Sequence, residues 1–188
     1  MEEIKSVLKE TKNKQPSNID AEQALIGSIL VNNDIIDEVS SIINPSIFFD
    51  PGHVKIYEVI ESLNNKGMIA NPITLKNFFE KDNTLSDVGG TEYLVKLTRF
   101  SGSVKQAIDY AKIIHEMYLR RELILISDNL SSETLNANDQ EQNAENIIES
   151  TEKSLFDIAE RGSFSQSFLK FNKALDQTIE MATQAMKN

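Results

Sequence analysis

The side chains best suited to chemistry in this chain are two histidines, His53 and His115, and an abundance of carboxylates. A zinc site needs three or four ligands in a defined geometry, often with two histidines at i and i+4 on one helix. The two histidines lie far apart and show neither HxxxH nor HExxH spacing. The chain has no cysteine, which excludes disulfides, thiolate metal sites and a cysteine nucleophile. We interpret His53 as a first-turn or packing residue and His115 as a surface residue, and we expect no metal site.

No other pattern marks an active site. The phosphate-binding pattern GxxxxGK[ST] is absent, and Gly89-Gly90 is followed by Thr-Glu-Tyr, with no lysine placed to reach a phosphate. These two glycines therefore indicate a turn before a helix. Carboxylate pairs are so common that no general acid–base pair stands out. We expect no catalytic, cofactor-binding or metal-binding residue, so an enzyme with an undetected site is the least favoured class of function.

The charge favours protein partners over nucleic acid. The formal net charge is −10 at neutral pH, whereas DNA binding draws most of its affinity from Lys and Arg on phosphates. The segment from Leu123 to Glu152 contains no Lys or Arg and carries these acids: Asp128, Glu133, Asp139, Glu141, Glu145, Glu149 and Glu152. The segment is either a solvated tip or an acidic docking face for a basic partner, which would speed association and select partners. The residues predicted for such a face are Glu141, Glu145, Glu149 and Glu152.

The sequence gives no sign of a membrane or export signal. The N-terminus, "MEEIKSVLKE", begins acidic and lacks a continuous apolar segment. No stretch approaches the roughly 18 uninterrupted apolar residues of a membrane span. We expect a cytoplasmic protein without membrane contact.

The apolar residues recur at helical spacing almost throughout, without convincing strand alternation. This pattern predicts an all-α fold, with a compact multi-helix head, a long antiparallel helical hairpin and a C-terminal linker helix. The predicted bounds are a flexible leader over 1–16, a globular helical head over 17–102, the hairpin over 103–162, and a spacer with the linker helix over 163–188.

The helix that opens the head carries both a start signal and an interior glycine. In "SNIDAEQALIGSIL", residues 17–30, Asp20 is the predicted N-cap, with Gln23 positioned to reach back to its backbone. Gly27 costs this helix about 1 kcal/mol relative to alanine. Either another helix approaches closely at Gly27, or the glycine is a tolerated defect. Later helices are predicted to begin at Thr74 or the residues just before it, and at Thr91.

The hairpin begins with a second capping box, Ser103 and Gln106, and its first helix meets no Gly or Pro before Asn136. At 1.5 Å per residue it is about 50 Å long, whereas a head of about 90 residues is roughly 30 Å across. The helix is therefore expected to extend past the head, with an apolar flank that needs cover. The second helix starts near Asn143 and carries a predicted apolar stripe: Ala144, Ile148, Thr151, Leu155 and Ile158.

Two further features leave alternatives open. Arg120 and Arg121, at the base of the hairpin, either pair with acids of a neighbouring copy or extend their charged ends to solvent. The last amphipathic segment carries Phe171, Leu175 and Ile179 on one side. That side either folds back on the hairpin or docks on a receptor elsewhere, and the flexible spacer before it favours the receptor.

Read together, these segments resemble the N-terminal domain of DnaB-type replicative DNA helicases. The matching pieces, in order, are "DAEQALIGSIL" (20–30), "FFDPGHVKIYEVIESLNNKG" (48–67), "PITLKNFFEKDNTLSDVGGTEYLVKL" (72–97), "YAKIIHEMYLRRELI" (110–124) and "NAENIIESTEKSLFDIAERG" (143–162). Residues 168–188 look like the linker helix of that family. The motor domain with its phosphate-binding loop, which follows the linker in the family, has no counterpart in this sequence.

The resemblance implies a non-catalytic collar module. In the family, such units pair and assemble as a trimer of dimers on a hexameric ring, DnaG-type primase docks on the collar, and the linker helix packs on a neighbouring motor domain. The resemblance also makes a helicase loader a further partner. ATP and Mg²⁺ would belong to the motor domain, as would contact with DNA, and this chain would need no cofactor.

The residues that we assign to these roles follow from the uncovered faces. Those predicted for the hairpin or for contact with a second copy are Met117, Leu119, Arg120, Arg121, Leu123, Ile126, Ile148 and Leu155. Phe171, Leu175 and Ile179 are predicted to dock on a neighbouring motor domain. The alternative function is a stand-alone helical adaptor or inhibitor that caps the replicative helicase.

Overall fold

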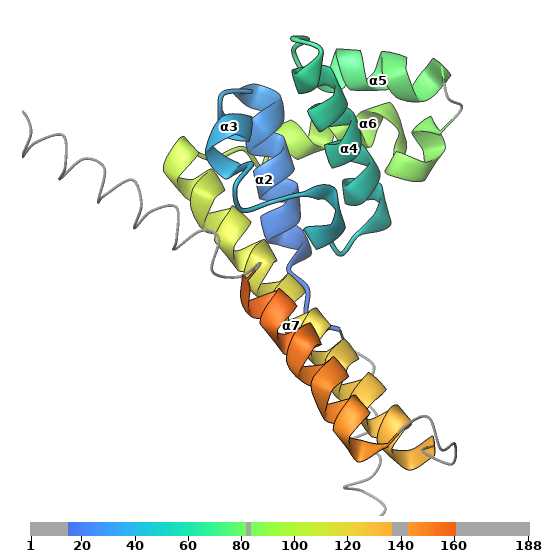
Figure 1. Ribbon diagram of the computed structural model, residues 1–188. Coiled ribbons are helices and arrows are strands. Elements are labelled where there is room, and N and C mark those ends of the chain that lie inside the picture. The colour runs from blue at the N-terminus through green and yellow to red at the C-terminus, as the bar shows by residue number, and fades with distance from the viewer. Residues whose placement is uncertain (1–14, 82–83, 137–142, 161–188) are drawn as a thin grey trace, which may run out of the picture. The chain divides into compact units, whose positions relative to one another are not determined.

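The structure is a computed structural model that describes residues 15–81, 84–136 and 143–160 (Figure 1). All regular structure in these three ranges is helical, which confirms the predicted all-α fold. The chain divides into two compact units, Met1–Glu122 and Leu123–Asn188. The finer four-part division stays a prediction. Most of the predicted leader and all of the predicted spacer and linker helix lie outside the described residues.

The first unit, the head, is a cluster of short helices closed by the start of a long one. In chain order these are α2 (Ile19–Val31), α3 (Ile35–Val39), η1 (Pro45–Ile47), α4 (Pro51–Asn65), α5 (Pro72–Lys81), η2 (Leu85–Val88), α6 (Gly90–Thr98) and α7 (Val104–Asn136). The division between the two units falls within α7.

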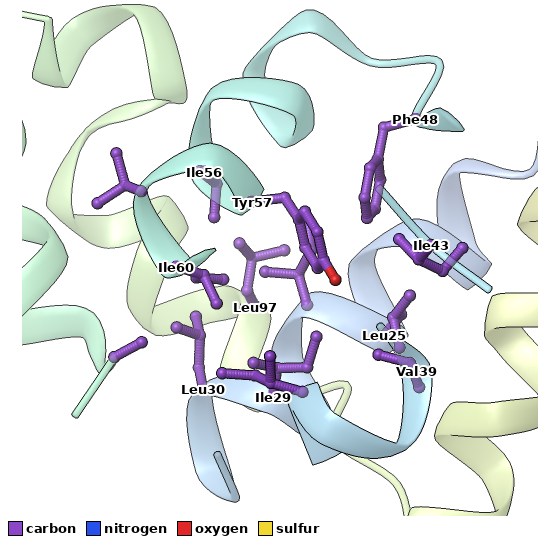
Figure 2. Packing of buried hydrophobic residues seen from close by; sticks show 14 of the residues in the cluster. Leu25, Ile29, Leu30, Val39, Ile43, Phe48, Ile56, Tyr57, Ile60 and Leu97 are labelled. Atoms are coloured by element: carbon purple, nitrogen blue, oxygen red, sulfur yellow. The ribbon is translucent and has the colours of Figure 1, made fainter. Parts of the chain in front are cut away.

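The core of the head lies where α2, α4 and α6 meet (Figure 2). Leu25 and Ile29 of α2 and Ile56 and Ile60 of α4 contribute to this core, and all four are fully buried. α7 closes the core with small side chains and one isoleucine, at Ala107, Ala111 and Ile114. Because these three residues belong to the core of the head, the beginning of α7 is part of the head.

Of the two adjacent phenylalanines before α4, Phe48 and Phe49, one fills the core. Phe48 is buried, and its ring centroid lies 5.0 Å from that of Tyr57 (Figure 2). Phe49, the next residue, is partly exposed. The chain is extended at the Phe48 position, and successive side chains of an extended chain point in opposite directions.

Gly27 lies at a close approach of two helices, as the first of the two interpretations predicted. A Cβ at Gly27 would overlap the backbone carbonyl of Leu97 in α6. The Ser28 hydroxyl accepts a hydrogen bond from Gly102 N at 2.9 Å and donates to Ala24 O at 2.7 Å. The missing side chain therefore lets α6 and the loop after it pack directly on α2.

Several helix starts differ from those predicted. α2 is capped by Asn18, whose Oδ1 accepts from Ala21 N at 3.0 Å, so Asp20 is not the cap. α6 begins after Gly89, which has φ 83°, and Thr91 lies inside the helix. A glycine suits this left-handed backbone because it has no Cβ. The predicted caps of α5 and α7 are confirmed: Asn71 accepts from Ile73 N and Thr74 N, and Ser103 and Gln106 form the capping box.

The second unit contains the hairpin. The end of α7 and a helix over 144–160 run antiparallel and side by side (Figure 1). A small depression is lined by Ile126, Asn129, Leu130 and Glu133 of α7 and by Ser150, Thr151 and Ser154 of the other helix. This arrangement confirms the predicted helical hairpin.

The predicted apolar stripe of the second hairpin helix agrees with the structure at Thr151 and Ile158 and is wrong at Ala144, Ile148 and Leu155. Ile147 is the buried isoleucine of this helix, whereas its neighbour Ile148 is 57% exposed and Leu155 is 43% exposed. Thr151 and Ile158 are half-buried, and Ala144 is exposed. Consecutive isoleucines fit either of two helix registers, and the apolar spacing alone does not choose between them.

None of the described helices combines the length and the apolar content needed to cross a bilayer.

Candidate protein-interaction site

A buried polar network lies in the head between α2, α4 and α6. Glu22 Oε2 lies 2.7 Å from His53 Nδ1, and His53 Nε2 lies 2.7 Å from the hydroxyl of Tyr93. Gln23 Nε2 donates to the same hydroxyl at 3.1 Å. Glu22 also accepts from the backbone N–H of Phe49 at 2.7 Å. The network therefore joins three helices and the loop before α4.

Local sequence places His53 in this network. Asp50 caps α4 by accepting from Gly52 N and His53 N, and Pro51 occupies the first turn. His53 is thereby held in the first turn of α4 and is fully buried, which confirms the interpretation as a first-turn packing residue. Gln23 does not cap α2 as predicted, because its side chain is bonded to Tyr93 instead.

One pattern of protons satisfies the whole network. A carboxylate can only accept, so His53 donates to Glu22 through Nδ1–H. His53 Nε2 then accepts the hydroxyl proton of Tyr93, and the Tyr93 oxygen accepts from Gln23. Burial raises the pKa of the Tyr93 hydroxyl, although the hydrogen bond from Gln23 opposes this rise. The network links three helices, and Glu22 and His53 are buried away from solvent. We therefore interpret the network as structural.

Metal-ligating geometry is not found in the described ranges, where no three His, Cys, Asp or Glu side chains gather as a ligand set.

His115 differs from the prediction of a surface residue. It is half-buried, and burial lowers the pKa of its imidazole. Its ring packs near Tyr118, with centroids 6.3 Å apart.

Arg121, predicted for the hairpin base, is instead bonded within the head. Its Nη1 donates to Pro16 O at 2.9 Å and its Nη2 donates to Ile47 O at 2.6 Å. Its guanidinium lies over the rings of Phe49, at 5.4 Å, and Tyr118, at 5.9 Å. Burial lowers the pKa of this guanidinium. Neither alternative offered for Arg121 describes these contacts, because the planar fork binds two backbone carbonyls of its own unit.

Arg120 lies in a different environment from its neighbour. It is exposed and pairs with Glu116 at 2.9 Å, one turn earlier in α7. Met117 and Leu119 are half-buried on the same helix. Their assignment to self-association stays a prediction.

The hairpin unit exposes many apolar side chains. Leu123, Ile148 and Leu155, all predicted for the hairpin or a second copy, are exposed, and Ile126 is half-buried. The other large apolar side chains exposed on the described part of this unit are Ile124, Leu125, Leu130, Leu135 and Phe156. Of the two roles predicted for Ile148 and Leu155, exposure favours contact with another molecule over holding the hairpin together.

The acidic residues predicted for docking share the second hairpin helix with Ile148 and Leu155. Glu145, Glu149 and Glu152 are exposed, and none forms an ion pair with a described residue. Glu141 lies outside the described residues. So do Phe171, Leu175 and Ile179, predicted to dock on a motor domain.

Sequence reasoning missed the buried network. Neither Glu22 nor Tyr93 belongs to a helix-start pattern or a metal-binding pattern. Because the chain contains many carboxylates, nothing in its composition distinguishes Glu22 from the others. A carboxylate among apolar residues in "IDAEQALIG" was the available signal, because a buried charged group needs partners.

The comparisons with known proteins agree on one family. The model of the DnaB-like helicase N-terminal domain matches residues 14–116, more than half of the chain. The chain is 38% identical over 173 residues to the replicative DNA helicase DnaB of Rickettsia conorii, covering 92% of this chain and 35% of that protein. It is 27% identical over 169 residues to the replicative DNA helicase DnaC of Bacillus subtilis, covering 90% of this chain and 36% of that protein.

Two solved structures share the fold. The N-terminal domain of DnaB helicase from Mycobacterium tuberculosis matches with a TM-score of 0.68 at 24% identity, covering 77% of this chain and 99% of that one. A DnaB-like replicative helicase, described with its interactions with primase, matches with a TM-score of 0.61 at 22% identity, covering 82% of this chain and 35% of that one. The chain spans about a third of the length of the Rickettsia conorii and Bacillus subtilis proteins and of the DnaB-like replicative helicase.

Proposed function

Because the chain belongs to the family of DnaB-like helicase N-terminal domains, we propose that it is a non-catalytic collar module of a replicative DNA helicase. In this role it joins copies of itself and provides the docking surface for a DnaG-type primase. The full helicase would unwind DNA in the cytoplasm with ATP and Mg²⁺ bound in a motor domain. A helicase loader is a further partner of that assembly.

The observation that carries this proposal is the apolar surface of the hairpin unit. Monomeric proteins rarely expose many large aliphatic side chains close together unless those side chains meet a partner. Leu123, Ile124 and Leu125 are exposed at the start of the unit, and Ile148 and Leu155 are exposed on one side of the second helix. Association of copies would bury these side chains at roughly 25 cal/mol per Å² of apolar surface.

Primase docking rests on a second observation, the acidic helix, and on a relative. The similar helicase structure is described with its interactions with primase. Exposed carboxylates that form no ion pair with a described residue attract a basic partner and raise the rate of encounter. We assign this role to Glu145, Glu149 and Glu152 on the described helix, together with Glu141. The linker role stays with Phe171, Leu175 and Ile179.

Self-association is tested by mass. Sedimentation of the chain at tens of micromolar is expected to show dimers or larger species, and the double variant Ile148→Ser, Leu155→Ser is expected to shift them toward monomer. The control is Ile73→Ser, which removes an exposed isoleucine from α5 of the head and should leave the mass unchanged. A wild-type chain that stays monomeric contradicts the assembly role.

Primase docking is tested with the C-terminal domain of the cognate primase. Titration is expected to show binding that the triple variant Glu145→Lys, Glu149→Lys, Glu152→Lys weakens. Glu38→Lys, on the exposed face of α3, is the control because it changes one carboxylate away from the hairpin. Equal binding by the triple variant and wild type would remove the docking role from this helix. We expect no ATP hydrolysis in any of these samples.

A further inference from the structure

The head carries a shallow groove along α6 that belongs to neither the buried network nor the hairpin. Thr91, Glu92, Val95, Lys96 and Arg99 line a depression of about 420 Å³. These positions recur along one side of the helix, because residues three and four apart are neighbours on a helix surface. Lys96 and Arg99 are both exposed. The groove is therefore open to solvent along its charged edge.

Positive charge gathers around this groove on an otherwise acidic chain. The segment from Tyr93 to Ile108 contains three cations, Lys96, Arg99 and Lys105, and no carboxylate. None of the three forms an ion pair with a residue in the described ranges. Glu92 is the one carboxylate in the groove lining. The local surface thus offers more cations than anions, and these cations are available to a ligand.

An exposed aromatic ring borders the two groove cations. Phe100 directly follows Arg99 and is 41% exposed. Lys96 Nζ lies 5.9 Å from the centroid of this ring. Proteins hold an unpaired nucleic-acid strand with the same combination, in which Lys and Arg contact phosphates and a base stacks on an aromatic side chain. An acidic peptide would meet the same cations but has no base to stack, so the exposed ring favours nucleic acid.

The net charge of −10 does not exclude such a contact. Exposed charges separated by more than about 10 Å are largely screened at 0.1 M salt. The potential at the groove therefore depends on the side chains nearest to it, which are two cations and one carboxylate. Two phosphate contacts give weak binding, and several grooves on associated copies would strengthen it by acting on one strand.

From this arrangement we propose that the α6 groove binds an unpaired DNA strand, with Lys96 and Arg99 on its phosphates and one base stacked on Phe100. The choice of DNA rests on the helicase family to which the chain belongs. The proposal goes beyond the proposed function, which gives this chain protein partners and leaves contact with DNA to a motor domain. It does not depend on self-association, because one copy supplies the whole groove.

Fluorescence anisotropy with a labelled oligodeoxythymidine of about 20 nucleotides tests the phosphate contacts on the full chain at low salt. Lys96→Gln, Arg99→Gln is expected to bind roughly tenfold more weakly than wild type. The slope of log affinity against log salt should become shallower by about 1.4, since each phosphate contact on a single strand contributes about 0.7. Lys66→Gln, Lys81→Gln removes the same charge from two other exposed lysines of the head, one of which also lies over a ring, and should bind as wild type.

Variants of Phe100 separate stacking from charge. Phe100→Leu keeps an apolar side chain without a flat ring, so binding should weaken roughly tenfold while the salt slope stays that of wild type. Phe100→Tyr keeps the ring and should bind as wild type. A purely structural role of Phe100 would not produce this pattern in folded variants, and far-ultraviolet circular dichroism checks that each variant folds.

Two further ligands decide between nucleic acid and protein. A DNA duplex hides the faces of its bases and should bind more weakly than the single strand, and a polyglutamate peptide should compete poorly. A wild-type chain that does not bind the strand overturns the proposal. Competition by polyglutamate as strong as that of the strand, with no loss in Phe100→Leu, also overturns it and would point to an acidic protein partner. Sedimentation of the same samples reports self-association separately, so a monomeric chain that binds the strand contradicts the proposed assembly alone.

Discussion

Tyr57 and Tyr93 differ in the hydrogen bonding of their hydroxyl groups. The Tyr93 hydroxyl has two side-chain partners, His53 and Gln23. The Tyr57 side chain is fully buried, and its hydroxyl finds no hydrogen-bond partner in the described part of the chain. Burial raises the pKa of Tyr57 as well, because the phenolate would lose its water. The two tyrosines therefore make a matched pair for one chemical change.

We predict opposite effects of removing these hydroxyls. Tyr93→Phe leaves His53 and Gln23 short of a partner and should destabilise the head by about 1–3 kcal/mol. Tyr57→Phe removes a buried group that has no partner, so the head should keep its stability or gain by up to about 1 kcal/mol. Urea denaturation followed by tyrosine fluorescence measures both, since all four tyrosines lie in the head. A larger loss for Tyr57→Phe than for Tyr93→Phe would refute the account of the network.

Arg120 and Arg121 form a second matched pair. Arg121→Ala removes two hydrogen bonds to the carbonyls of Pro16 and Ile47 and the contacts with two rings, so a loss of about 1–3 kcal/mol is expected. Arg120→Ala removes one exposed ion pair and should cost less than about 0.5 kcal/mol. Arg121→Lys should rescue little, because lysine lacks the planar fork. The same urea denaturation experiment measures both variants. Equal losses of unfolding free energy for Arg121→Ala and Arg120→Ala would contradict the structural role given to Arg121.

His115 should make stability depend on pH in a known direction. Burial lowers its pKa in the folded chain, so the unfolded chain takes up the proton first as the pH falls. Stability is therefore expected to fall below the ordinary pKa of histidine, about 6.5. His115→Gln should flatten this part of the curve relative to wild type. An unchanged pH curve in the variant would show that His115 does not contribute.

At the scale of elements, the packing of α2 on α6 depends on Gly27. Alanine normally improves a helix by about 1 kcal/mol over glycine, but the new methyl at Gly27 would overlap the Leu97 carbonyl. Backbone cannot yield as a flexible side chain can, so Gly27→Ala should destabilise the head by about 1–3 kcal/mol or more.

Gly102→Ala is the control for this prediction. Its added methyl would meet only the side chain of Gln106, and the φ of Gly102 is not in the left-handed region. A smaller effect than at Gly27 is expected in thermal unfolding. If Gly27→Ala raised the melting temperature, Gly27 would be a defect rather than a packing site.

The hairpin shows what the helical spacing of apolar residues can predict and what it cannot. The spacing predicted both helices and their antiparallel pairing, and the structure confirms them. It did not choose between Ile147 and Ile148, because two adjacent isoleucines support two faces that differ by about 100°. The choice depends on which side meets α7, a contact between segments that local spacing does not encode.

At the scale of the whole molecule, the uneven charge should control encounters. The chain carries a net charge of −10 with its hairpin tip free of cations from Leu123 to Glu152. Exposed charges are screened over about 10 Å at 0.1 M salt. We therefore predict that raising the salt from about 0.05 M to about 0.5 M slows association with the primase domain and changes dissociation less. Stopped-flow mixing measures both rates, and an on-rate independent of salt would argue against an electrostatic docking face.

The sequence by itself determined the class of fold, the existence of a head and a hairpin, and the family. These follow from the spacing of apolar residues, from the glycines and prolines that end helices, and from motifs that can be recognised by their order in the sequence. Ser103 with Gln106 and Asn71 before Thr74 were also predictable, because capping joins residues only a few positions apart.

Only the tertiary structure decided the partners of the polar side chains. Glu22 and His53 are 31 residues apart and Arg121 and Pro16 are 105 residues apart, yet each pair is in direct contact. The burial that makes these contacts worth forming arises only when distant helices pack together. The same reason explains why Arg121 bonds within the head while Arg120, one residue earlier, stays at the surface.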